Sequence, residues 1–202
     1  MDLRDRLGSI GPKRILAIDG GGIRSLISLG FLEQIEALLR ERHNNPNLRL
    51  YEYFDLIGGT STGAVLAAGL AVGMDVAELK RYYIRLSDKT FIRSSFKLWE
   101  LLFKKGPIER ELNKFFADIT LGSTEIQTGL CVATKRADTN SIRLFLNHPK
   151  DVYYSRFCGI LLRDILYASL GGKSFLTPRK ISLKPGEIAA FTDAGVSVVN
   201  NP

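Results

Sequence analysis

Two short apolar segments of this chain each run directly into a group of glycines that is followed by a helical pattern. The first unit comprises residues 14–19 (RILAID), three glycines and the helical periodicity of residues 23–42. The second comprises residues 53–57 (YFDLI), two glycines and the small apolar segment 62–71. Two successive units of strand, turn and helix favour a mostly parallel sheet that is covered by helices.

Further periodic segments extend this plan along the chain. We expect helices over residues 75–86, 107–116 and 159–169, and strands over residues 130–134, 142–146 and 188–192. The sequence therefore predicts an α/β fold, a three-layer α/β/α sandwich with a mostly parallel central sheet. With 202 residues and 45% hydrophobic content, the chain is expected to form a single domain over residues 1–202.

The net charge of +7 favours acidic partners, which include nucleic acids and anionic membrane surfaces. No nucleic-acid-binding motif is found, so we expect no nucleic-acid partner. The longest apolar run, residues 64–72, is too short to span a bilayer, and residues 1–13 are too charged for a signal peptide. We expect a cytoplasmic protein without a transmembrane segment. Cys131 and Cys158 lack the spacing of a zinc site and are expected to be buried free thiols, so no metal is expected.

The segment GGTSTG, residues 58–63, contains the pattern G-x-S-x-G around Ser61. In a nucleophile elbow the serine stands on a sharp turn between a strand and a helix, and glycines flank it because side chains there would collide with neighbouring backbone. A strand is predicted before Ser61 and a helix after it, and Gly59 and Gly63 hold the two glycine positions. Ser61 is therefore the candidate nucleophile. The alternative is a turn whose serine only caps the helix.

A nucleophilic serine needs a base, and the chain has only two histidines, His43 and His148. His43 lies in a polar stretch after the first long helix. A triad would require Asp138 and His148, although Asp138 lies in a predicted hairpin turn. Asp193, at the end of the last predicted strand, is expected at the same edge of the sheet as Ser61. Partial burial raises the pKa of a carboxyl group, so a two-residue dyad of Ser61 and Asp193 is chemically reasonable.

The first glycine turn, Gly20, Gly21 and Gly22, leads from a strand into a helix N-terminus. Its N–H groups are expected to form an oxyanion hole, which the N–H of Thr62 can join. The same glycines could instead bind a nucleotide phosphate. That alternative is weaker, because a G-x-G-x-x-G pattern would need glycine where Ser25 stands, and a Walker pattern would need glycine in place of Tyr167.

Together these elements resemble the patatin-like phospholipase family. Its three motifs are a glycine-rich turn of the form D-G-G-G-x-R-G, a G-x-S-x-G nucleophile and a D-G-A/G element, and they occur here in the family's order. The resemblance implies a lipid acyl hydrolase that acts on membrane lipids at the membrane surface and needs no metal or organic cofactor. Ser61 would attack the ester, Asp193 would accept its proton, and the glycine turn would hold the oxyanion. The resemblance assigns supporting roles to Asp19, Arg24, Gly59, Gly63 and Gly195.

Two residues depart from the family pattern. Ser25 stands where the glycine-rich turn usually ends in glycine, and Ala194 follows Asp193 where the family usually has glycine. A positive φ at residue 194 would cost about 1 kcal/mol or more and would displace the carboxylate. The alternative function is therefore a catalytically inactive lipid-binding or regulatory module with the same fold. We also expect the chain to lack a C-terminal region, because family members usually continue beyond this point.

A lipid hydrolase must reach an interface, and residues 90–105 (TFIRSSFKLWELLFKK) mix aromatic and basic side chains. This composition suits the headgroup region of a membrane, where tryptophan is favoured, and Trp99 is the only tryptophan of the chain. Trp99 and Phe103 are therefore candidate membrane contacts. The alternative is an ordinary helix that packs its apolar stripe on the core.

Overall fold

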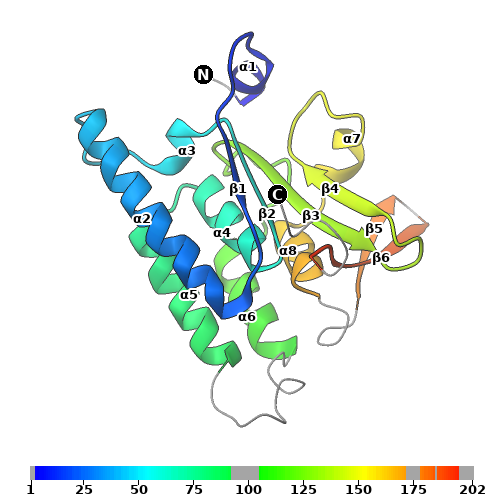
Figure 1. Ribbon diagram of the computed structural model, residues 1–202. Helices are drawn as coiled ribbons and strands as arrows, with labels where there is room; N and C mark the ends of the chain where they lie inside the picture. Colours follow the sequence, from blue (N-terminus) through cyan, green and yellow to red (C-terminus); the bar gives the residue numbers. More distant parts are fainter. Residues whose placement is uncertain (1–2, 92–104, 172–177, 185, 196–202) are drawn as a thin grey trace.

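A computed structural model of the chain describes residues 3–91, 105–171, 178–184 and 186–195. Its elements in chain order are α1 (Leu3–Gly8), β1 (Ile15–Ile18), the 3-10 turn η1 (Gly22–Arg24), α2 (Ser25–Arg42), α3 (Leu50–Tyr53), β2 (Leu56–Thr60), α4 (Thr62–Ala71), α5 (Val76–Phe91), α6 (Lys105–Phe116), β3 (Gly129–Arg136), β4 (Ile142–Leu146), α7 (Tyr154–Phe157), α8 (Leu162–Leu170), β5 (Arg179–Lys184) and β6 (Glu187–Asp193). The helices flank one central sheet, as Figure 1 shows. The α/β class expected from the sequence is thereby confirmed.

The sheet is mixed. Strands β1, β2 and β3 run parallel, as expected for successive strand, turn and helix units. In contrast, β4 and β6 both pair antiparallel with β3, and β5 pairs antiparallel with β6. We expected a mostly parallel sheet, but the parallel pairing is confined to β1, β2 and β3. Short connections join β3 to β4 and β5 to β6, and antiparallel neighbours can be connected in this way without a crossover.

Strands β2 and β6 share one edge of β3. The β4 strand pairs with the full stretch from Cys131 to Lys135 and therefore occupies the other edge. On the shared edge, Thr60 at the end of β2 pairs with Ala133, and Asp193 at the end of β6 pairs with the next residue, Thr134. The two strands thus meet end to end, and this junction brings the last third of the chain beside its first third.

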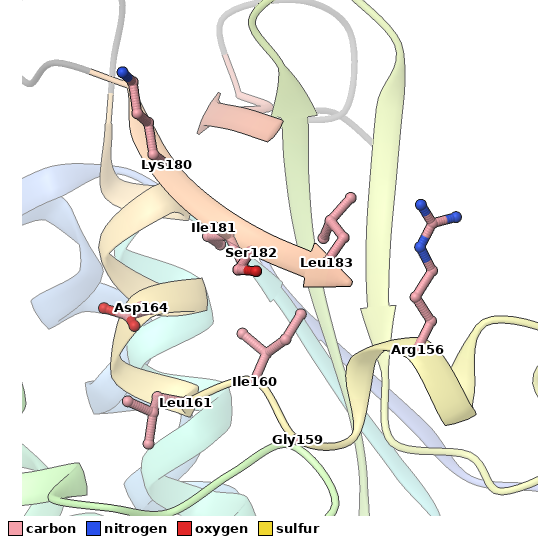
Figure 2. Close-up of a pocket in the computed structure, with 9 residues that line it drawn as sticks. All are labelled: Arg156, Gly159, Ile160, Leu161, Asp164, Lys180, Ile181, Ser182 and Leu183. Atoms are coloured by element: carbon pink, nitrogen blue, oxygen red, sulfur yellow. The ribbon is translucent and has the colours of Figure 1, made fainter. Parts of the chain in front are cut away.

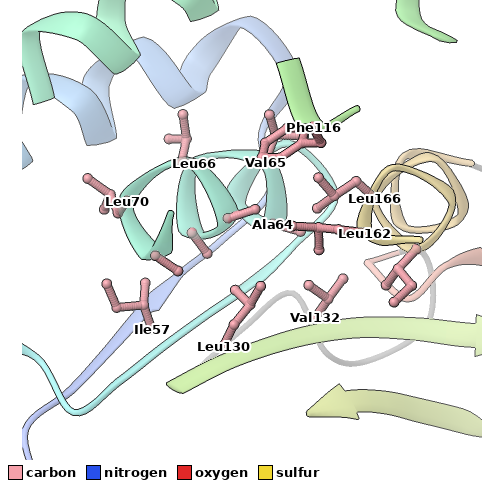
Figure 3. Packing of buried hydrophobic residues seen from close by; sticks show 14 of the residues in the cluster. Ile57, Ala64, Val65, Leu66, Leu70, Phe116, Leu130, Val132, Leu162 and Leu166 are labelled. Atoms are coloured by element: carbon pink, nitrogen blue, oxygen red, sulfur yellow. The ribbon is translucent and has the colours of Figure 1, made fainter. Parts of the chain in front are cut away.

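The core lies between the sheet and the helices that follow the parallel strands. All ten residues of α4 are buried, which explains why this helix has no polar face. Figure 3 shows Ile57, Leu130 and Val132 of the sheet on one side of α4, and Val65 and Leu66 on its opposite side, where Val65 lies near Phe116 of α6. Helix α4 also contacts α5, and α5 packs between α2 and α6. The turn at Ser61 therefore leads into a helix that is buried along its whole length.

Several element boundaries differ from the prediction for local reasons. The strand predicted from residue 53 begins at Leu56, because residues 50–53 form the short helix α3, in which Glu52 accepts a hydrogen bond from the N–H of Arg49. The helix predicted from residue 159 begins at Leu162, because the carbonyl of Ile160 accepts from the N–H of Leu121 in an extended contact. Strand β5 was not predicted, since its sequence RKISLK alternates with charges and lacks an apolar run.

None of the helices in the described ranges is long and apolar enough to cross a membrane.

The close packing of the elbow gives a direct test of the fold. A Cβ on Gly63 would lie 2.1 Å from the carbonyl oxygen of Ile18, which belongs to the backbone of β1 and cannot move aside. We expect Gly63→Ala to lower the free energy of unfolding by about 3 kcal/mol or more. Gly30, within α2, has open space around it, and Gly30→Ala should stabilise the helix by up to about 1 kcal/mol. Urea denaturation of both variants measures this, and equal midpoints would contradict the packing described.

Candidate active site

Ser61 stands on a sharp turn between β2 and α4. Its backbone has φ 54° and ψ −127°, a combination that residues with a Cβ rarely adopt. Such a conformation costs on the order of 1–3 kcal/mol and persists only where neighbouring groups hold it. The sequence pattern predicted this elbow, and the strand before it and the helix after it agree with the prediction.

Three glycines allow the elbow to pack tightly. A Cβ on Gly59 would lie 2.4 Å from the backbone carbonyl oxygen of Gly63, so position 59 cannot carry a side chain in this geometry. A Cβ on Gly20 would lie 2.6 Å from the Cβ of Ser61. The first glycine of the glycine-rich turn is therefore in direct contact with the candidate nucleophile, as the oxyanion-hole hypothesis requires.

The other two glycines of that turn donate to a side chain. The N–H groups of Gly21 and Gly22 both hydrogen-bond to the hydroxyl oxygen of Thr62, at 3.1 Å each. The hydroxyl groups of Thr62 and Ser25 lie 2.8 Å apart and form a further hydrogen bond. The two amides thus converge on one oxygen atom next to Ser61, and this oxygen belongs to the residue that follows the nucleophile.

Helix α5 fixes the glycine turn from outside. The hydroxyl of Tyr83 donates to the carbonyl of Gly22 at 2.6 Å, and Tyr83 is almost fully buried. The start of α5 is bound in turn by Glu36 of α2, whose carboxylate accepts from the N–H of Val76 at 3.2 Å. Sequence reasoning missed Tyr83, because an isolated tyrosine within an amphipathic helix carries no recognisable signal.

Asp193 reaches the site through the junction of β2 and β6. It is 8% exposed, and its carboxylate accepts a hydrogen bond from the N–H of Gly195 at 2.7 Å. Burial raises the pKa of this carboxyl group above its ordinary value, and the N–H of Gly195 and the hydroxyl of Ser61 offset part of that rise. A buried carboxylate of raised pKa near a serine hydroxyl is a candidate acceptor for the serine proton.

The two departures from the family motifs cause no backbone strain. Ser25 lies at φ −62° and ψ −11°, an ordinary helical conformation that any residue adopts. Within the described ranges, the non-glycine residues with positive φ are Asn44, Ser61, Ala117 and Asn140. Ala194 is absent from this set, so the conformational penalty considered for position 194 does not arise.

Neither histidine lies beside Ser61. His148 follows the end of β4 that pairs with Cys131, whereas Ser61 follows Thr60, which pairs with Ala133 further along β3. His43 packs its ring against Tyr53, just before β2 begins, with ring centroids 6.0 Å apart. The geometry therefore does not assemble a triad.

Asp138, the acid of that alternative triad, is bound elsewhere. It forms an ion pair with Arg136 in the β3–β4 turn, with the closest nitrogen and oxygen atoms 2.6 Å apart.

Four predicted residues remain, two beside the glycine turn and two outside the part of the chain that the structure describes. Asp19 and Arg24 are exposed and line a hollow of about 380 Å³ beside the glycine turn. The backbone N–H of Arg24 closes the turn by donating to the carbonyl of Gly21 at 3.1 Å. Trp99 and Phe103 lie outside the described residues.

A second hollow, of about 510 Å³, is separate from these groups. Figure 2 shows it between the N-terminal end of α8 and β5, where Ile160, Asp164 and Lys180 are among its lining residues. Asp164 is engaged there by the guanidinium of Arg179. None of the residues of the elbow or of the glycine turn lines this hollow.

Comparison with known proteins agrees with the motifs. The model of the family described as patatin-like phospholipase matches residues 16–202. The chain is 29% identical over 189 residues to the cUMP-AMP-activated phospholipase of Escherichia coli, covering 94% of this chain and 56% of that protein. It is 54% identical over 200 residues to Patatin-T5 of Solanum tuberosum, covering 93% of this chain and 50% of that protein.

Among solved structures, VipD from Legionella pneumophila is similar with a TM-score of 0.54 and 11% identity, covering 96% of this chain and 48% of that one. At that identity the likeness concerns the fold alone. The chain spans about half the length of the curated relatives it matches. Because the family model matches residues 16–202 and the motifs meet at the elbow, we conclude that the chain belongs to the patatin-like phospholipase family.

Proposed function

We propose that this chain is a lipid acyl hydrolase in which Ser61 is the nucleophile and Asp193 its base. The observation that carries the proposal is the junction of two strands on β3: β2 leads into the strained elbow at Ser61, and β6 ends there at the buried Asp193. Strain at Ser61 and desolvation at Asp193 both have a cost in stability, and such costs are typical of functional sites. Family membership supports a lipid ester as the substrate.

The reaction follows from these groups. The Ser61 oxygen attacks the carbonyl carbon of a fatty-acyl ester while its proton passes to Asp193. When the tetrahedral intermediate collapses, the bond to the leaving alcohol breaks and that alcohol takes the proton from Asp193. Water then attacks the acyl-enzyme and gives a proton to Asp193. The bond between the acyl carbon and the Ser61 oxygen breaks, the Ser61 oxygen takes that proton, and the fatty acid is released. No cofactor takes part in this proposal.

The glycine turn would stabilise the negative charge of the intermediate. In the free chain, the Thr62 hydroxyl accepts the N–H groups of Gly21 and Gly22. One oxygen atom that accepts two amide donors next to the nucleophile resembles an oxyanion in its hole. We propose that the substrate oxygen takes this place when the Thr62 side chain turns away.

The same contact favours the second candidate, a catalytically silent lipid-binding module. If Thr62 keeps both amides, the N–H groups of Gly21 and Gly22 are not available to hold an oxyanion, and the Ser61 hydroxyl stays unreactive. A covalent probe of serine reactivity separates the two candidates.

We expect a fluorophosphonate probe to label the folded chain, and Ser61→Ala to abolish both the labelling and ester hydrolysis, with a loss of about 1,000-fold or more. Mass spectrometry of the labelled peptide identifies the modified residue. Ser123→Ala is the matched control, because Ser123 lies in a loop where its hydroxyl contacts Glu125, and it should react like the unmodified chain. Absence of labelling in folded protein would favour the silent module.

The raised pKa of Asp193 gives a pH dependence. Only the ionised carboxylate accepts a proton, so activity should be lost as the pH falls through the pKa of Asp193. Because that pKa is raised, the acid limb of the kcat profile should lie above the ordinary value of 3.8.

Asp193→Asn should reduce kcat by about 100-fold or more, since an amide cannot accept the proton. Asp118→Asn is the control, because the side chain of Asp118 is 94% exposed, and His148→Ala tests the triad. Both should retain full activity. A large loss in His148→Ala, or retained activity in Asp193→Asn, would contradict the dyad.

Membrane contact through Trp99 and Phe103 remains a proposal from the sequence. Replacing both residues with alanine should lower binding to anionic vesicles by about tenfold, because aromatic side chains anchor proteins at the interface. Sedimentation with vesicles measures this. Val152→Ala, which removes an apolar side chain that is 83% exposed, is the control. Unchanged vesicle binding with an intact fold would reject the contact.

A further inference from the structure

Residues at the C-terminal end of α8 form hydrogen bonds with the backbone N–H groups of both Ser61 and Asp193. The hydroxyl of Ser169 accepts a hydrogen bond from the N–H of Ser61 at 2.9 Å. Directly after the helix, the carbonyl of Gly171 accepts from the N–H of Asp193 at 2.9 Å. One short segment, residues 169–171, therefore contacts the ends of both strands that meet at the site.

Ser169 also binds the sheet itself. Its hydroxyl donates to the carbonyl of Ala133 at 2.8 Å while it accepts from Ser61. Ala133 pairs with Thr60, the last residue of β2, so the hydroxyl connects the two strands at the point where the chain leaves the sheet for the elbow. A backbone donor and a backbone acceptor both find a partner in this single oxygen atom.

The residue type at position 169 follows from these two contacts. Ser169 has no exposed surface, so no water replaces its hydroxyl. A hydroxyl group donates one hydrogen bond and accepts others, and serine is short enough to reach backbone from a helix packed on the sheet. Alanine would leave the N–H of Ser61 and the carbonyl of Ala133 without this partner, and buried polar groups are normally paired.

We propose that Ser169 is a positioning residue for the reaction, because its hydroxyl holds the Ser61 backbone in the strained conformation that directs the nucleophile at Asp193. The inference rests on the proposed role of Ser61 as nucleophile. Asp193 is held separately by Gly171, so without Ser169 the elbow relaxes while the base stays in place. The distance between the two reacting groups then changes, and the chemical step slows more than substrate binding does.

This role could not be predicted from the sequence. Ser169 lies within the apolar segment LYASL, where a small polar residue is compatible with an ordinary buried helix position. The proposal rests on the hydrogen bonds that Ser169 makes to Ser61 and Ala133 in the folded chain.

The test compares two buried hydroxyl groups at opposite ends of β2. Ser169→Ala removes the contact at the elbow. Thr128→Val, the control, removes a hydroxyl that has no exposed surface and donates to the carbonyls of Phe54, at 2.7 Å, and Asp55, at 3.1 Å, where β2 begins. Ser169→Thr restores the hydroxyl. Urea unfolding, kcat and KM on a water-soluble nitrophenyl ester, and the rate of fluorophosphonate labelling are measured for each variant and for the unmodified chain.

We expect both hydroxyl deletions to lower stability, but only Ser169→Ala to reduce kcat and the labelling rate, by about 100-fold, with KM within about twofold. Ser169→Thr should recover most of the lost kcat. If Ser169→Ala does not fold, Ser169→Cys, which keeps the side-chain size but is a weak donor, replaces it with the same expectation.

Equal kcat in the Ser169→Ala and Thr128→Val variants would overturn the positioning role, as would a loss confined to KM. No hydrolysis and no labelling in the unmodified chain would instead reject the proposed function, so the two failures are distinguishable.

Discussion

The site depends on the way in which two strands share one edge of β3. Strand β2 ends at Thr60 beside Ala133, and β6 ends at Asp193 beside Thr134, so the strands meet end to end. Backbone hydrogen bonds of the sheet thereby define where Ser61 and Asp193 lie, before any side-chain contact is considered. Loops move more readily than paired strands, so groups placed at strand ends keep a more constant separation. The segment after α8 strengthens this junction through Ser169 and Gly171.

In the proposed dyad, the buried Asp193 takes the place that a histidine has in many serine hydrolases. An exposed aspartate is too weak a base, but desolvation raises the pKa of Asp193, and Gly195 and Ser61 offset part of that rise. Glycines make this arrangement possible on the other side, because Gly20 lies against Ser61 where a side chain would collide. The elbow, the glycine turn and the carboxylate therefore depend on one another, and each needs the close approach of the others.

Sequence reasoning predicted the local parts of the site better than their arrangement. The elbow at Ser61 and the buried helix over residues 62–71 were predicted because glycine spacing and uniform small apolar residues are local signals. Asp193 was expected beside Ser61 because the carboxyl ends of parallel strands lie at one edge of a sheet. Strand β6 is in fact antiparallel to β3, and its end lies beside Ser61 because β6 pairs only with residues 134–136 of β3. Tyr83 and Ser169 were missed, because each forms a hydrogen bond with a residue far away in the sequence. Neither residue lies in a recognisable sequence motif.

A crystal structure of the chain after reaction with a fluorophosphonate would show the proposed nucleophile and oxyanion hole together. We expect phosphorus on the Ser61 oxygen and the Asp193 carboxylate within about 3.5 Å of that oxygen. We also expect a phosphonyl oxygen that accepts the N–H groups of Gly21 and Gly22 in place of the Thr62 hydroxyl. An adduct on another residue, or an Asp193 carboxylate more than about 6 Å from Ser61, would contradict the proposed dyad.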